Sequence, residues 1–358
     1  MEAVGQVIGQ TAGSNGTAPQ VRDVVVKDRQ VSLTVLVPGG GTDAPLEAAL
    51  RGALEAIGAE TVHLRFRPLA EGAGAAPAQQ AAAGAGGAVR GHGAGMERHP
   101  LLDPRSGVQF IAVASGKGGV GKSTVTVNLA VALARQGKRV GIIDADIYGF
   151  SVPDMMGIEE KPQIVNERVI PIERFGVKVI SMGFFVEDNA PIVWRGPMLG
   201  KMLRNFFSEI EWGDLDYMLL DLPPGTGDVA LDVHQMIPQS KEIIVTTPHA
   251  TAAFVAARAG AMAIKTEHEI LGVVENMSYY ECPSCGKRDE VFGRGGGARL
   301  AEQLHTDLLA QLPLGVPDNH VAEPDFSPSI YKADTVTGQL YNEIAQAVIA
   351  RCEQASGE

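Results

Sequence analysis

Apolar residues in the second half of the chain come in short, near-continuous runs separated by helical stretches. The runs are residues 110–114, 140–144, 217–222, 242–246 and 271–275. Between them, apolar residues recur at helical spacing, for example over 123–136 and 251–265. Buried strands that alternate with helices predict an α/β fold, a mostly parallel sheet with helices on both faces. Ligands of such sheets bind beyond the carboxyl ends of the strands.

The first seventy residues have a different pattern. Residues 31–37 and 61–66 alternate apolar and polar side chains, as half-buried strands do. Between them, residues 45–57 predict a helix whose apolar face comprises Leu46, Ala49, Leu50, Ala53, Leu54 and Ile57. Residues 72–95 are nearly all Ala, Gly, Gln and Pro, which cannot offset their ordering entropy by burial. The sequence therefore predicts a small α+β domain over 1–70, a flexible linker over 71–104 and a larger domain over 105–352.

Composition narrows the class of protein. The chain has 358 residues, 45% of them hydrophobic, which suits two domains with a substantial core. Its formal net charge of −12 disfavours bulk binding to nucleic acid. No apolar run approaches the length of a membrane span, and residues 1–10 lack the features of a signal peptide. We expect a soluble cytoplasmic protein with no nucleic-acid or membrane partner.

A phosphate-binding loop follows the first predicted strand of the larger domain. Residues 116–123 read GKGGVGKS and open a helix, which is the context that the G-x-x-x-x-G-K-[ST] pattern requires. Lys122 is expected to reach the β- and γ-phosphates of ATP, Ser123 to ligate Mg²⁺, and Thr124 to add a contact. Backbone N–H groups of the loop are expected to wrap the phosphates; they belong to Gly116, Lys117, Gly118, Gly119, Val120 and Gly121.

Aspartates end two further predicted strands. Asp144 and Asp146 alternate at one strand end, where both can face Mg²⁺ and water, although Asp is also common in turns. Asp221 ends an apolar strand about a hundred residues after the loop, as the Mg²⁺-binding Walker B aspartate does. In the run after it, residues 223–228, two prolines restrict the backbone and the glycines that follow leave it free to change conformation. This suits a segment that moves on hydrolysis.

Two cysteines, Cys282 and Cys285, form a C-x-x-C turn whose sulfurs can bind one metal. The third, Cys352, is remote, so one chain cannot complete a four-cysteine site through this motif. Two chains related by a two-fold axis can, which favours a [4Fe–4S] cluster shared by a homodimer. A four-cysteine zinc site, a redox dithiol and an inert pair are the alternatives.

The phosphate loop resembles the deviant Walker A class, because Lys117 follows its first glycine. In proteins of that class, the extra lysine reaches the nucleotide of a partner subunit. The resemblance therefore implies that Lys117, with Lys122 and Asp146, is catalytic, with Asp146 orienting the attacking water and Asp144 supporting the Mg²⁺ shell. It also implies that Asn276, at the end of a late strand, contacts adenine; the alternative is an amide satisfied within its loop.

The motifs together resemble the Mrp family of ApbC-type carriers over about residues 105–351. They are, in chain order, GKGGVGKS, DADIYG, WRGPM, DLPPGTGD, ENMSYYECPSC and VFGRGGG. The resemblance implies weak ATP hydrolysis, a homodimer, and a labile [4Fe–4S] cluster that is passed to apo-proteins and received from an assembly scaffold. Phe150 stands where relatives tend to have proline, and the small domain lacks the Asp-Pro-Glu and the cysteine expected of an iron–sulfur-assembly domain.

Three other functions share parts of this pattern. A partition or septum-site ATPase shares the lysines and aspartates, but it does not explain the cysteine turn. A zinc-stapled, ATP-dependent chaperone would use the turn as a structural site. An electron-transfer ATPase of the nitrogenase iron-protein kind would take its bridging cysteines from widely separated positions, whereas these share one turn.

Overall fold

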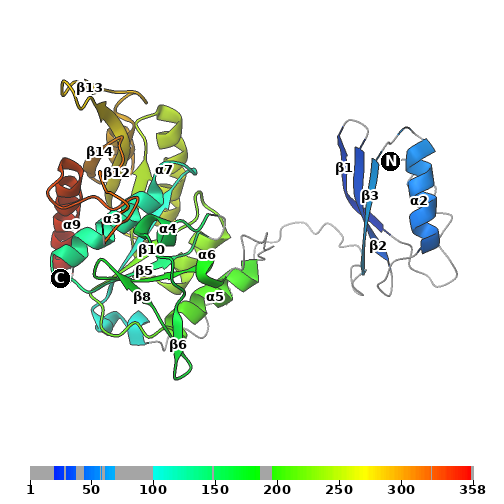
Figure 1. Ribbon diagram of the computed structural model, residues 1–358, viewed down its shortest axis with the longest axis horizontal. Helices are drawn as coiled ribbons and strands as arrows, with labels where there is room; N and C mark the ends of the chain where they lie inside the picture. The colour runs from blue at the N-terminus through cyan, green and yellow to red at the C-terminus, as the bar shows by residue number, and fades with distance from the viewer. Residues whose placement is uncertain are drawn as a thin grey trace, which may run out of the picture. The chain divides into compact units, whose positions relative to one another are not determined.

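The computed structural model describes residues 20–27, 30–37, 44–56, 58, 61–68, 100–146, 149–185, 196–323 and 325–355. The chain divides into two compact units, Met1–Gly87 and Ala88–Glu358 (Figure 1). The low-complexity stretch 72–95, the centre of the predicted linker, lies outside the described residues. Within the described ranges, no helix combines the length and the apolar character that crossing a membrane requires.

In its described residues, the first unit is a three-stranded sheet with one helix. Its elements are β1 (Gln20–Lys27), β2 (Gln30–Val37), α2 (Ala44–Ala56) and β3 (Thr61–Pro68). β2 pairs antiparallel with β1 and parallel with β3, so α2 is the crossover between parallel neighbours. Leu46, Leu50 and Leu54, one turn apart, are buried. The predicted strands and helix are confirmed, but β1 was not predicted, Ala49 is exposed, and Ile57 lies outside the described residues.

The second unit is built on a nine-stranded sheet in the order β13-β12-β11-β4-β10-β5-β9-β8, with β14 also paired to β12. Its parallel strands are β4 (Gln109–Ser115), β5 (Val140–Asp144), β9 (Val177–Ser181), β10 (Tyr217–Asp221), β11 (Lys241–Thr246), β12 (Ile270–Glu281) and β14 (Leu308–Pro313). β8 (Ile172–Arg174) and β13 (Arg288–Asp289) pair antiparallel with β9 and β12. A separate hairpin joins β6 (Gln163–Val165) to β7 (Arg168–Ile170).

Helices cover both faces of this sheet (Figure 1). One hydrophobic core lies under α3 (Lys122–Arg135), α4 (Val152–Met156) and α9 (Val336–Ala355). The other lies under α5 (Gly196–Ser208), α6 (Asp228–Met236), α7 (Ala250–Lys265) and α8 (Gly296–Gln303). The part of this unit that the structure describes also contains three short 3₁₀ helices: η1 (Pro100–Leu102), η2 (Pro104–Ser106) and η3 (Met182–Phe185). The predicted α/β class, with a preceding α+β unit, is confirmed.

Two segments differ from their predicted extent. β12 continues to Glu281, six residues beyond the predicted strand, because its outer part pairs with both β13 and β14. Residues 100–104, which the sequence assigned to the linker, form η1 and the start of η2, where Leu102 is buried. Within the described residues, these five positions therefore belong to the second unit.

The strand order brings the predicted motifs together. β10 lies between β4 and β5, and Asp221 is in register with Val113 on one side and Asp144 on the other. The phosphate loop follows β4 directly. Because all three strands are parallel, their motif-bearing ends meet at one edge of the sheet.

A buried imidazole cluster lies among α6, β11 and the start of β12. The His234 and His268 rings stack with centroids 4.2 Å apart, His234 also contacts Glu242, and both rings hydrogen-bond Thr266 Oγ1. Burial, and then the neighbouring His234, lowers the pKa of His268 below its usual value.

This shift predicts a pH-dependent stability. Because the folded-state pKa of His268 lies below the unfolded value near 6.5, the unfolded chain binds more protons in that window. The free energy of unfolding should therefore decrease as pH falls from 7 through 6.5 and below. Urea unfolding from pH 7.5 to 5 measures it. His268→Gln should flatten this dependence, whereas the same change at the exposed His320 should leave it intact.

Candidate nucleotide and cysteine sites

The phosphate loop joins β4 to α3 with its middle facing solvent. Lys117, Gly118 and Gly119 are exposed, while Val120 is buried. The other side of the loop packs against α7, where a Cβ added to Gly116 would lie 2.3 Å from the Ala256 backbone nitrogen. The predicted phosphate-binding face is therefore open, and the rest of the loop is supported by a helix.

Four predicted side chains meet at the end of this loop. Lys122 Nζ lies 2.7 Å from Asp221 Oδ2 and 3.6 Å from Asp146 Oδ2. Ser123 Oγ donates to Asp221 Oδ2 at 2.6 Å. All four side chains are largely buried, which strengthens the electrostatic interactions among them. The lysine, the hydroxyl and both carboxylates thus form one cluster below the phosphate loop.

Asp144 lies beside this cluster and is held by protein donors. Its Oδ2 accepts from Ser181 Oγ at 2.9 Å, and its Oδ1 accepts from the backbone N–H of Asp146 at 3.2 Å. Burial and the neighbouring Asp221 carboxylate raise the pKa of Asp144 to about 8. Asp144 therefore braces the backbone that carries Asp146, in addition to its predicted place near Mg²⁺.

The donor set fits a magnesium ion. Ser123 Oγ and the Asp221 carboxylate are hard oxygen donors, and Mg²⁺ is usually held by one or two carboxylates together with phosphate oxygens and water. Burial is the main cause that raises the pKa of Asp144, and the second cause, repulsion by the Asp221 carboxylate, is of the kind that a nearby cation offsets. Residue roles toward Mg²⁺ and ATP remain predictions.

Asn276 contacts the phosphate loop itself. Its Nδ2 donates to the Val120 carbonyl at 3.0 Å, and the side chain is 7% exposed. A Cβ on Gly121 would lie 2.0 Å from that nitrogen. Asn276 therefore supports the loop, and its predicted contact with adenine stays a prediction.

This close approach makes Gly121 sensitive to substitution. Gly121 has φ +84° and Gly137 has φ +80°, so alanine at either position takes a left-handed strain of about 1–2 kcal/mol. Of these two glycines, only Gly121 would place the added Cβ within 4 Å of other side chains, those of Asn276 and Met277. We expect Gly121→Ala to lower the free energy of unfolding by more than Gly137→Ala and to weaken ATP binding at least tenfold, about 1.4 kcal/mol. Chemical denaturation and titration calorimetry measure the two effects, and equal results for both variants would contradict the prediction.

The cysteine pair lies in the turn between β12 and β13. The turn is closed by hydrogen bonds from Cys282 N to Lys287 O at 3.0 Å and from Gly286 N to Cys282 O at 2.8 Å. Cys285 is exposed and Cys282 is partly exposed. Backbone N–H groups of Ser284 and Cys285 lower the pKa of the Cys282 thiol, which favours the thiolate that binds metals.

Cys352 has the opposite environment. It is buried in α9, and burial raises the pKa of its thiol to about 11, as for an inert core residue. Over the residues that the structure describes, no three His, Cys, Asp or Glu side chains are placed to hold a metal ion. The exposed pair thus offers two sulfurs to a site that needs further ligands.

Three polar residues of these sites were not predicted. Thr126 Oγ1 donates to Asp221 Oδ1 at 2.6 Å, and its position four residues after Lys122 on α3 was the available signal. Ser181 ends β9, a strand that the sequence analysis did not identify. Glu275 is fully buried and accepts the N–H of Gly297 at the start of α8.

Parts of two motifs lie outside the described residues. They are Ile147 and Tyr148 of DADIYG and Trp194 and Arg195 of WRGPM, whose remaining residues begin α5. In the 223–228 run, the N–H of Gly225 donates to the Ser115 carbonyl at 2.7 Å. This bond joins the segment after Asp221 to the start of the phosphate loop.

More than half of the chain matches a family model. Residues 107–349 match a model described as ParA: NUBPL iron-transfer P-loop NTPase. An iron-sulfur cluster carrier protein of Bacillus subtilis (strain 168) is 54% identical over 340 residues, which are 94% of this chain and 92% of that protein. Another iron-sulfur cluster carrier protein, from Escherichia coli (strain K12), is 43% identical over 68% of this chain and 66% of its own length.

Two solved structures resemble the second unit. A nucleotide-binding protein from Archaeoglobus fulgidus, in complex with ADP, is 36% identical with a TM-score of 0.53, over 70% of this chain and 91% of that one. The cell division ATPase MinD of Pyrococcus furiosus is 21% identical with a TM-score of 0.50, over 68% and 99%, and shows the fold alone. The length matched by the model and the identity to the Bacillus protein show that the chain belongs to the family of NUBPL iron-transfer P-loop NTPases.

Proposed function

We propose that this protein is an ATP-hydrolysing iron–sulfur cluster carrier that works as a homodimer and passes a [4Fe–4S] cluster to apo-proteins. The observation that carries the proposal is the cysteine turn, where two accessible thiols face solvent and no third ligand group lies beside them in the described chain. A carrier must hold its cargo where another protein can take it. Relatives 54% and 43% identical are named iron-sulfur cluster carrier proteins, which supports this reading.

The proposed dimer follows from the ligand number. A [4Fe–4S] cluster takes four thiolates, and each chain supplies Cys282 and Cys285. A two-fold axis through the cluster would give both chains the same environment. The partly exposed position of the pair suits later release, since exposed clusters are open to attack by the thiols of an acceptor.

The proposed ATP chemistry uses the cluster of residues below the phosphate loop. Lys122 binds the β- and γ-phosphates, Ser123 and Asp221 hold Mg²⁺, and Asp146 orients the attacking water. Lys117 is exposed, so it is available to the active site of the second subunit, where its charge would stabilise the transition state. Turnover is expected to be weak, because the active site of each chain lacks the Lys117 side chain of the second subunit until the dimer closes.

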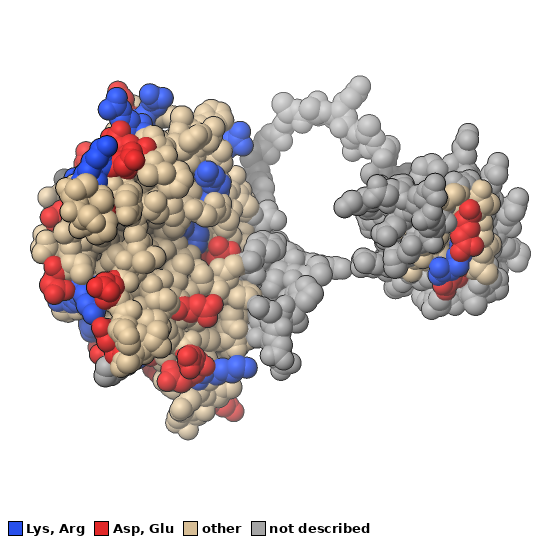
Figure 2. Space-filling model, turned by 45° about the horizontal axis from the view of Figure 1, so that its top comes forward, with Lys and Arg blue, Asp and Glu red and all other residues tan. Residues whose placement is uncertain are grey.

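The proposed partners are apo iron–sulfur proteins and a cluster-assembly scaffold, in the cytoplasm. On the face shown in Figure 2, Lys and Arg side chains of the second unit alternate with Asp and Glu rather than forming a continuous basic surface. With a net charge of −12, this distribution gives little support to a positioning ATPase that tracks DNA.

Metal analysis of anaerobically purified protein tests the proposal. About four iron and four sulfide per dimer, and transfer of that cluster to an apo-protein whose activity it restores, are expected. Stoichiometric zinc without sulfide would support the zinc-stapled chaperone instead. ATP-dependent co-sedimentation with liposomes or DNA, without bound iron, would support a positioning ATPase.

A further inference from the structure

The cysteine loop, residues 282–295, is anchored at both ends to the nucleotide-binding part of the fold. Its first end leaves β12, the strand that carries Asn276, and its second end enters α8 at Gly296. Asn276 Nδ2 donates to the Val120 carbonyl of the phosphate loop. One strand therefore contacts the phosphate loop and leads into the loop that bears the metal-binding thiols.

The residue before Asn276 closes this connection. Glu275 is fully buried, and its Oε2 accepts from the Gly297 N–H at 2.5 Å, in the first turn of α8. Its Oε1 accepts from Ser278 Oγ at 2.9 Å and from Gln311 Nε2 of β14 at 2.7 Å. The carboxylate thus bonds to both sides of the cysteine loop, at Ser278 before it and at Gly297 after it.

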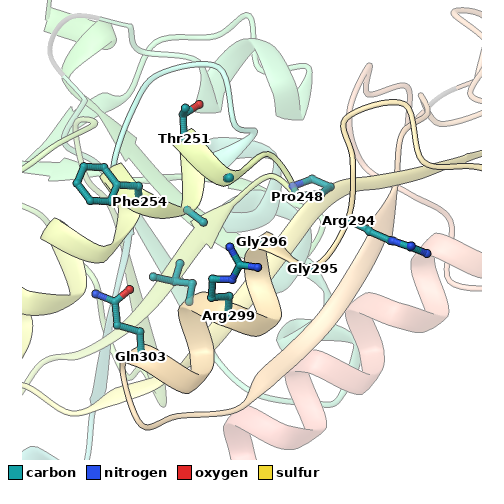
Figure 3. Close-up of a pocket in the computed structure, with 11 residues that line it drawn as sticks. Pro248, Thr251, Phe254, Arg294, Gly295, Gly296, Arg299 and Gln303 are labelled. Atoms are coloured by element: carbon teal, nitrogen blue, oxygen red, sulfur yellow. The ribbon is translucent and has the colours of Figure 1, made fainter.

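Close packing leaves the start of α8 little freedom at this point. A Cβ on Gly297 would lie 2.6 Å from the Glu275 Cβ, and one on Gly296 would lie 2.3 Å from the Pro248 carbonyl oxygen. Figure 3 shows Gly296 at the start of α8, beside a pocket of about 360 Å³ that Phe254 of α7 and Arg299 of α8 also line. α8 is therefore closely packed against Glu275 and Pro248 at its first turn, while the pocket lies along its other side from Gly296 to Gln303.

The strand itself is irregular where these contacts occur. The pairing of β12 with β14 shifts between Glu275 and Tyr279, and Met277 has φ +56°, which is uncommon for a residue other than glycine. Such irregularities re-aim side chains at functional sites. Here the irregularity lies directly after the two residues that contact α8 and the phosphate loop.

We propose that Glu275 is a positioning residue that couples the nucleotide site to the cysteine loop, by tying the first turn of α8 to the strand that holds the phosphate loop through Asn276. A movement of the phosphate loop at Val120 shifts Asn276, and the adjacent Glu275 transmits it to Gly297 and to the cysteine loop. The biological role of this coupling, control of a bound cluster, rests on the proposed function. The coupling is a property of the metal-free chain.

Thiol reactivity of the metal-free, full-length protein tests the coupling. The rate of iodoacetamide alkylation at Cys282 and Cys285 is measured by peptide mass spectrometry, with and without saturating Mg-ADP, which occupies the phosphate loop without a γ-phosphate. We expect ADP to change the wild-type rate at least about fivefold, which is the lower end of the usual size of a coupling between two sites. In Glu275→Gln, which keeps the shape of the side chain, the ratio should fall to near one.

Matched variants separate coupling from folding. Glu302→Gln makes the same chemical change at an exposed position on α8 and should keep the wild-type ratio. Glu275→Gln should retain ADP binding and cooperative unfolding, so that only the dependence on ADP is lost. A wild-type ratio of one, or a Glu275→Gln ratio equal to that of wild type, overturns the proposal. Iron content, measured separately, tests the carrier function, so the two can fail independently.

Discussion

Replacing Cys282 and Cys285 together by serine is expected to reduce anaerobically bound iron to less than about a tenth of the wild-type amount, because a serine hydroxyl is a much weaker ligand for iron than a thiolate. Both thiols lie in the solvent-facing turn between β12 and β13. The fold should survive, since neither side chain belongs to a hydrophobic core. Iron and sulfide analysis, with circular dichroism of the same samples, measures the result.

The third cysteine provides the control. Cys352 is buried in α9, far along the chain from the turn, and Cys352→Ala should bind as much iron as the wild-type protein. If the double variant lost iron, the dimer should weaken with it, which sedimentation under anaerobic conditions would show. Full iron content in the double variant, with a monomeric protein, would refute the shared-cluster arrangement.

Lys117→Ala is expected to hydrolyse ATP about 10²–10³-fold more slowly than wild type, the usual effect of removing one donor to a developing negative charge. ATP affinity should change little, because Lys122 and the loop backbone remain. Lys117 is exposed, whereas Lys122 is buried against Asp221. Phosphate release measures the turnover, and titration calorimetry measures the affinity.

A mixing experiment shows whether Lys117 acts on the opposite subunit. Lys117→Ala and Lys122→Ala proteins should each hydrolyse ATP at least about 10²-fold more slowly than wild type. A mixed dimer should recover one competent site, made from Lys122 of the Lys117→Ala chain and Lys117 of the Lys122→Ala chain. Lys265→Ala, at the exposed end of α7, is the control and should keep wild-type turnover. Unchanged turnover in Lys117→Ala would remove the trans-acting role.

The local parts of the fold and the site were predictable from sequence. The phosphate loop follows one buried strand, Asp144 and Asp221 end two others, and a parallel sheet brings such strand ends together at one edge. The cysteine turn was also predictable, because its C-x-x-C spacing and its Pro, Ser and Gly residues are typical of an exposed turn. These features depend on neighbours in sequence, so one chain segment contains the whole signal.

Features that depend on distant partners were not predictable. Ser181 comes to Asp144 only because β9 pairs with β5, and no pattern in either segment gives that pairing. The outer half of β12 carries weak strand signals, since its partners β13 and β14 lie elsewhere in the chain. In the sequence, Glu275 is a polar residue at the end of a predicted strand, with nothing to indicate a role. Its contact with Gly297, which is distant in sequence, becomes visible only in the structure.

The placement of the thiols on a loop that is held at both ends has an evolutionary consequence. Residues 282–295 leave the body of the domain after Glu281 and rejoin it at Gly296, which is closely packed against Pro248. Insertions, deletions or changes of ligand within that loop need not disturb the ATP-binding framework. Related proteins with this framework can therefore evolve different ligand residues in the cysteine loop while they keep the same ATP-binding domain.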